Sequence, residues 1–216
     1  GRSVSNIKTY HDYQNIKNFD YSKGISFKGE NITQGDDKLS NYHIASSFNS
    51  CNAKNKVFDY LHKDILKNIL ISGARYIEIK IFNSEYGEDT ERVTVTPVVN
   101  NGLNKGEWKL CFSEIQFEDF CIILKQNAFT FLKKTEDNSY NGVPNPDDPL
   151  FLALDLKTNS NTNVLNKLSN MIVKYLGDYL LPRQYRDYKN DTNLNTITTN
   201  ELKEKLVILC SDGHEG

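Results

Sequence analysis

The chain has 216 residues, of which 38% are hydrophobic, and a formal net charge of -2 at pH 7. This length suffices for one domain with a sizeable core, and so small a net charge implies no bulk electrostatic attraction to nucleic acid or to an anionic membrane. No run of about 18 apolar residues could span a membrane and no secretory signal is visible, so we expect a cytoplasmic protein or one peripheral to an assembly.

Residues 1–36 are rich in Tyr and Asn and lack sustained periodicity, which predicts an irregular N-terminal arm. Beyond the arm, apolar or β-branched runs alternate with amphipathic stretches, a pattern typical of a mostly parallel sheet covered by helices. Only the turn-rich segment 84–89 separates the second strand run from the third, so that junction is expected to be antiparallel. Five strands are predicted, at 42–47, 75–82, 92–99, 149–156 and 204–210. Three helices are predicted, at 57–69, 117–128 and 164–175.

Two long polar loops, 133–148 and 182–201, each join a helix to the following strand. In a β/α barrel such loops lie on the face opposite the usual active site, so partner contacts are expected partly on that face. Small basic clusters fall in these loops, and solvated faces are favoured for them over weak contact with phospholipid headgroups. The clusters are Lys133 with Lys134, and Arg183 with Arg186 and Lys189.

Seven ordered segments carry a resemblance to a known family. The first, from Leu39 to Ser50, reads L-S-N-Y-H-I-A-S-S-F-N-S, and the second, from Gly73 to Phe82, reads G-A-R-Y-I-E-I-K-I-F. They resemble the X region of phosphoinositide-specific phospholipase C, whose first segment is L-S-H-Y-x-I-x-S-S-H-N-T. The other five segments begin at Pro97, Phe117, Pro149, Tyr175 and Leu202.

The resemblance implies an α/β, TIM-barrel-like (β/α) phosphodiesterase fold. Residues 37–211 would form its amino-terminal half barrel, preceded by the arm 1–36 and followed by a tail at 212–216. A closed barrel of this kind needs about eight strands, and the sequence offers five. A second half barrel or another protein partner is therefore expected to cover the open edge. No nucleic-acid partner and no transmembrane segment are expected.

At both catalytic positions implied by the resemblance, the family's histidine is replaced by another residue. Phe48 stands at the first catalytic histidine and Asn101 at the second. In the family, one imidazole takes the proton from the inositol 2-hydroxyl and the other stabilises charge on the phosphate. A phenyl ring has no titratable group, and an amide cannot carry a proton through the cycle. Positioned acid–base catalysis contributes roughly 10² to 10⁴ in rate, so little turnover is expected.

The implied calcium site is altered as well. Asn49, Glu78 and Asp155 still offer the family's oxygen ligands, but Lys80 replaces an acidic ligand. Calcium takes about six to eight oxygens and favours negative charge, so a salt-bridge network in place of the metal is predicted. The phosphate-binding lysines of the family are also replaced, by Leu209 and Ser211.

The sequence therefore favours a catalytically inactive phospholipase C-like module that serves binding or assembly and uses no cofactor. The alternative is an active calcium-dependent phosphoinositide phosphodiesterase, or one half of a larger enzyme of that type. The two interpretations differ in whether chemistry survives the five substitutions, and a function must be argued from the site and not from the fold.

Overall fold

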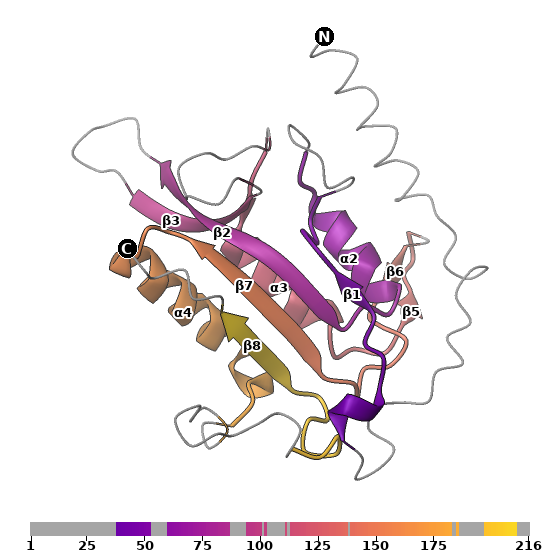
Figure 1. Cartoon of the computed structure of the whole chain (residues 1–216). Coiled ribbons are helices and arrows are strands. Elements are labelled where there is room, and N and C mark those ends of the chain that lie inside the picture. Colours follow the sequence, from indigo (N-terminus) through magenta and orange to yellow (C-terminus); the bar gives the residue numbers. More distant parts are fainter. Residues whose placement is uncertain are drawn as a thin grey trace.

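The computed structural model describes residues 38–52, 60–86, 94–100, 102, 111, 113–137, 139–182, 185 and 197–210 (Figure 1). The predicted arm at 1–36 and the predicted tail at 212–216 lie outside these residues.

One mixed sheet organises the fold, with strand order β4-β3-β2-β7-β8 and with β1 paired to the beginning of β2. Strand β2 runs parallel to β1 and β7, and β7 runs parallel to β8. Strand β3 is antiparallel to β2, which confirms the antiparallel junction expected from the short connection. The strands are β1 (Ser46–Ser47), β2 (Tyr76–Tyr86), β3 (Thr94–Asn100), β4 (Ile115–Gln116), β7 (Leu150–Lys157) and β8 (Leu206–Cys210).

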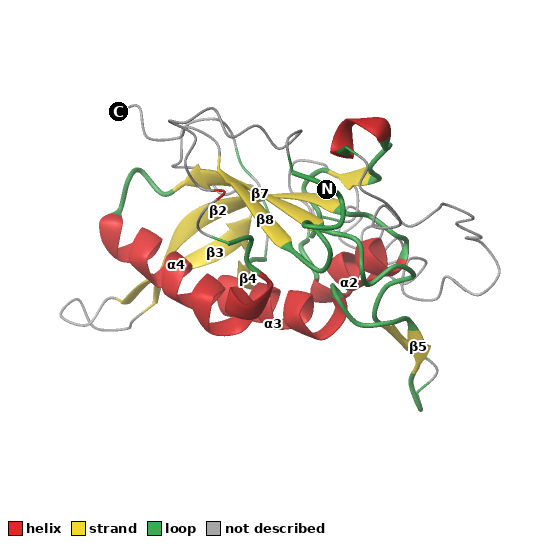
Figure 2. Ribbon diagram, turned by 90° about the horizontal axis from the view of Figure 1, so that it is seen from below, coloured by secondary structure: helices red, strands yellow, loops and turns green. Residues whose placement is uncertain are grey.

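Three α-helices form a layer against one face of this sheet (Figure 2). They are α2 (Lys63–Ile71), α3 (Phe117–Asn127) and α4 (Thr162–Leu176). Helix α4 begins where the Asn161 side chain accepts hydrogen bonds from the backbone N–H groups of Asn163 and Val164, as capping residues commonly do. Two 3-10 turns, η1 (Leu39–Asn41) and η2 (Gly177–Tyr179), and a separate hairpin of β5 (Lys133–Lys134) and β6 (Tyr140–Asn141) complete the described elements.

The main core lies between the helices and the sheet. Side chains alternate between the two faces of a strand, and Ile77, Ile79 and Ile81 of β2 point to the helical face, where each is at most 1% exposed. Leu152 and Leu154 of β7 belong to the same cluster. The helices contribute the apolar residues predicted from their spacing, including Phe117, Phe120 and Leu124 of α3 and Leu168, Ile172 and Leu176 of α4.

The opposite face of the sheet is divided into two parts. Near the amino ends of the strands, Phe151 and Val207 belong to a second apolar cluster that Ile197 and Leu202 share. The segment 197–202, which ends the predicted loop 182–201, thus packs on the chain's own sheet. Near the carboxyl ends the same face carries charged residues, which are described below.

Arg75, just before β2, connects the helical layer to the start of β7. The residue is 6% exposed, and its guanidinium donates hydrogen bonds to the carbonyl oxygens of Ala128 at 2.8 Å, Pro149 at 3.1 Å and Asp148. It also lies 5.4 Å from the centroid of the Phe129 ring. Burial lowers the pKa of Arg75 to about 10, so the group remains charged at neutral pH.

Three expectations about elements need correction. The first strand begins at Ser46 and not at residue 42, and Ile44 before it packs against the second apolar cluster. The first helix begins at Lys63, since Leu61 is held in a bridge to Asn52; the expected helical start at Val57 lies outside the described residues. The loop 133–148 contains the β5–β6 hairpin.

Candidate functional site

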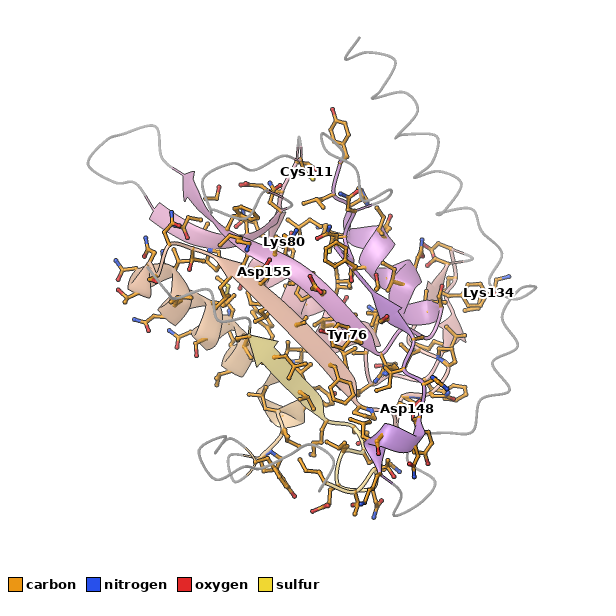
Figure 3. All side chains as sticks on the ribbon, in the orientation of Figure 1. Tyr76, Lys80, Cys111, Lys134, Asp148 and Asp155 are labelled. Atoms are coloured by element: carbon orange, nitrogen blue, oxygen red, sulfur yellow. The ribbon has the colours of Figure 1, made fainter. Side chains whose placement is uncertain are left out.

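The candidate site lies just beyond the carboxyl end of β1, in the first half of β2 and near the carboxyl end of β7, on the face of the sheet opposite α2, α3 and α4. Parallel strands bring their carboxyl ends to one edge of a sheet, which is where ligands of α/β folds usually bind. In the β2–β7 register Lys80 is opposite Asp155 and Glu78 is opposite Ala153. Figure 3 shows Lys80 and Asp155 side by side, with Lys80 near the middle of β2 and Asp155 near the carboxyl end of β7.

The turn after β1 brings Phe48 and Asn49 to this edge. The backbone N–H of Ser50 donates to the carbonyl oxygen of Glu78 at 3.1 Å, which ties the turn to β2. Asn49 has a φ of 49° and is 7% exposed; asparagine tolerates this left-handed conformation better than most residues. The Phe48 side chain is 53% exposed, and the Lys80 Nζ lies 5.2 Å from the centroid of its ring.

The charged groups of the site compensate one another. The Lys157 Nζ lies 2.9 Å from the Asp155 Oδ1, and both side chains are largely shielded from solvent. The pKa of Glu78 is raised above its ordinary value, mainly by burial and then by the negative charge of Asp155, while Lys80 opposes the shift. Two carboxylates and two ammonium groups therefore share one small region.

On the β3 side, Asn100 continues the candidate site across the sheet. Asn100, at the end of β3, is opposite Lys80 and is 4% exposed. Its Oδ1 accepts a hydrogen bond from the Cys111 backbone N–H at 3.2 Å, and its Nδ2 donates to the Ser113 carbonyl at 3.3 Å. Asn100 therefore anchors the chain that returns toward α3, beside the site.

The structure brings together five of the predicted positions: Phe48, Asn49, Glu78, Lys80 and Asp155. Leu209 lies in β8 opposite Ala153, so it continues the row of Glu78, and it packs against the second apolar cluster. Asn101 and Ser211 lie outside the described residues.

Sequence reasoning missed Lys157 and Asn100. Lys157 could have been found from the alternation of strand side chains, because it is two residues beyond Asp155 and therefore on the same face. His43 lies before β1, and His62 is the N-terminal cap of α2, where its side chain accepts a hydrogen bond from the Asp64 N–H.

A family model for the X domain of phosphatidylinositol-specific phospholipase C matches residues 36–211. The chain belongs to this family. No curated protein sequence matches the chain significantly. Among solved structures, PLC21 of L. pealei and PLC21 of S. officinalis each match with a TM-score of 0.57 and 20% identity, over 82% of this chain. The match spans 19% of each of those chains, so this X domain corresponds to about a fifth of their length.

These findings confirm the family and the TIM-barrel-like fold inferred from the sequence. Within the described part of the chain, the sheet runs from β4 to β8 without closing, as a half barrel should. Among the residues placed by the structure, no helix is long and apolar enough to cross a membrane.

The family's calcium ion does not fit the side chains of this X domain. Calcium is held by about six to eight oxygens and prefers negative charge, whereas here the carboxylates of Glu78 and Asp155 face the ammonium groups of Lys80 and Lys157. Across the described ranges, no group of three or more His, Cys, Asp or Glu side chains is positioned to hold a metal ion.

Proposed function

We propose that this X domain is a catalytically inactive phospholipase C-like module that serves in binding or assembly. The contact between Phe48 and Lys80 carries the proposal. At the position where the family's first histidine transfers a proton, the chain places a phenyl ring with an ammonium group 5.2 Å from its centroid. Neither a phenyl ring nor an ammonium group offers a lone pair that could accept a proton from an attacking hydroxyl.

The runner-up is an active phosphodiesterase, and Glu78 is the residue that most favours it. A carboxylate with a raised pKa beside other charged groups is a reasonable general base. Its raised pKa has burial as its first cause and Asp155 as its second. The nearby positive charge of Lys80 counts against this role, because it stabilises the ionised carboxylate and weakens it as a base.

A hydrolysis assay distinguishes the inactive module from the active phosphodiesterase. The purified chain should release no inositol phosphate from phosphatidylinositol or its phosphorylated forms, with or without calcium. Calcium-dependent release that disappears in a Glu78→Ala variant would establish the runner-up, with Glu118→Ala as the matched control. Glu118 is bound to Tyr175 and Lys174 on the helical layer, away from the strand ends.

The outer edge of β8 supports the assembly role. The Leu181 N–H donates to the Leu206 carbonyl at 3.1 Å, next to a parallel bridge between Leu180 and Leu206, so the start of this edge is covered by the chain itself. Further along, a groove of about 510 Å³ opens between β8 and α4, lined by Leu165, Ile172 and Val173 among other residues. Val173 is 59% exposed.

The occupant we propose for this groove is a second half barrel that adds a strand parallel to β8 and a helix beside α4. Strands β2, β7 and β8 are mutually parallel, so the next strand of the same twist and direction would continue the sheet. An uncovered strand edge beside an apolar groove is a known cause of aggregation, which makes a partner advantageous. The solved structures with this fold also extend far beyond the matched part, since it spans 19% of each.

A further inference from the structure

Two of the substituted positions touch each other although they come from different elements. Phe48 follows β1, whereas Lys80 lies in the middle of β2, and the Lys80 Nζ is 5.2 Å from the centroid of the Phe48 ring. An ammonium group within about 6 Å of a ring centroid is attracted by the negative face of the ring. The two substitutions therefore form one interaction and are not independent losses.

The Lys80 ammonium lies near carboxylates, as a bound cation would. Lys80 is opposite Asp155 in the register of β2 and β7, and Glu78 precedes it by two residues on the same face of β2. Asp155 has a second positive neighbour, Lys157, at 2.9 Å. Two carboxylates are thus balanced by two ammonium groups, and a divalent ion added to this set would bring two positive charges without compensation.

We propose that the Lys80 ammonium is the resident cation of this site, with the Phe48 ring as its cover, and that the pair excludes divalent metal ions. The proposal deepens the proposed function, since it concerns the same two residues. A tethered ammonium requires no free metal and leaves no coordination position for a phosphate oxygen, so the site keeps its shape at any calcium concentration.

Calorimetric titration with calcium chloride tests the metal part of this proposal. The unmodified chain should show no binding heat and no rise in melting temperature at millimolar calcium. Lys80→Asp should bind calcium in roughly the millimolar range or tighter, the range of the weaker protein calcium sites, and should melt at a higher temperature with calcium than without. Adding Glu78→Gln to this variant should remove the binding.

The matched control is Lys125→Asp, which makes the same change of charge on an exposed residue of α3 and should bind no calcium. Equal calcium affinity of the unmodified chain and Lys80→Asp, whether both bind or neither does, overturns the proposal. Calcium binding by the unmodified chain overturns it even if the chain has no turnover. Turnover without calcium would refute the proposed function and leave this inference standing.

The role of the Phe48 ring is tested by a double-mutant cycle, which remains informative if Lys80→Asp folds poorly. Phe48→Leu, Lys80→Met and the double variant are compared by melting temperature. Contacting residues show non-additive effects, so the double variant should lose less than the sum of the two single losses. Additive losses would overturn the proposed pairing of ring and ammonium.

Discussion

At the scale of single residues, charged side chains occur in two settings: the lysines of the candidate site pair with a ring or a carboxylate, and the buried Arg75 supports the fold. Lys80 lies against the Phe48 ring, and Lys157 pairs with Asp155. Arg75, just before β2, is buried among backbone carbonyl groups and the Phe129 ring. Arg75 thereby links the end of α3 to the starts of β2 and β7.

We predict that Arg75→Met destabilises the domain by on the order of 3 kcal/mol. The substitution leaves the carbonyl oxygens of Ala128, Pro149 and Asp148 without their donor, and an unsatisfied buried polar group costs about 1–3 kcal/mol. Urea unfolding measures the loss. Lys63→Met is the control, because the pair of Lys63 and Asp119 at 3.3 Å is exposed and such pairs contribute about 0–1 kcal/mol. Equal effects of the two substitutions would contradict the structural role of Arg75.

The sequence predicted the residues of the site better than their interactions. Phe48, Glu78, Lys80 and Asp155 were identified by position within segments that resemble the family, and the structure brings them to one edge. That Lys157 pairs with Asp155, and that Lys80 lies against the Phe48 ring, depends on how β1, β2 and β7 are placed in space. Arg75 was missed for the same reason, since its partners are 53 or more residues away in sequence.

At the scale of elements, periodicity predicted the long helices and the central strands well. The helix expected at 117–128 is α3 (Phe117–Asn127), and the one expected at 164–175 is α4 (Thr162–Leu176). Prediction failed where tertiary contacts outweigh local pattern. Strand β1 is limited to two residues, with Ile44 before it packed against the second apolar cluster, and the β5–β6 hairpin depends on one glycine.

Gly142→Ala should destabilise the hairpin and its attachment to α3. Gly142 has a φ of 90°, and a Cβ there would lie 2.5 Å from the carbonyl oxygens of Thr130 and Phe131. We expect a loss of at least about 1 kcal/mol in the free energy of unfolding, since alanine is strained at this φ.

Gly177→Ala is the matched control for this prediction. Gly177 has a φ of -54° at the end of α4, and the nearest atom to an added Cβ is 4.0 Å away. Alanine there should be neutral or slightly stabilising. Similar unfolding free energies for the two variants would show that the hairpin tolerates a side chain at residue 142 and would contradict the geometry described above.

At the scale of the whole molecule, the described residues cover one face of the half barrel well, whereas among them β8 has no neighbouring strand on its outer side beyond the Leu180–Leu206 bridge. The helices cover one face, and the segment 197–202 covers the amino-terminal part of the other. Strand β8 is the last strand of the described sheet (Figure 1). The groove lined by residues of α4 and β8 lies beside it. The sequence predicted the open edge from the number of strands, but the groove could not be predicted, because it depends on how closely α4 packs beside β8.

We expect the isolated chain to sediment as more than a monomer at tens of micromolar, through this edge. Val173→Asp should weaken the association, because it places a charge on an exposed residue that lines the groove. Asn170→Asp, which adds the same charge on an exposed residue of α4 outside the groove lining, should not. A compact monomer of the unmodified chain, or equal effects of the two variants, would contradict the proposed interface.

The most direct test of catalytic inactivity is phosphorus NMR of phosphatidylinositol vesicles incubated with the chain and calcium. The phosphodiester signal of the lipid should remain unchanged, because Phe48 and Lys80 supply neither a proton acceptor nor a metal position. A catalytically competent phospholipase C serves as the positive control for the vesicles. New signals of a cyclic inositol phosphate or a phosphate monoester, formed by the unmodified chain and lost in Glu78→Ala, would contradict the account.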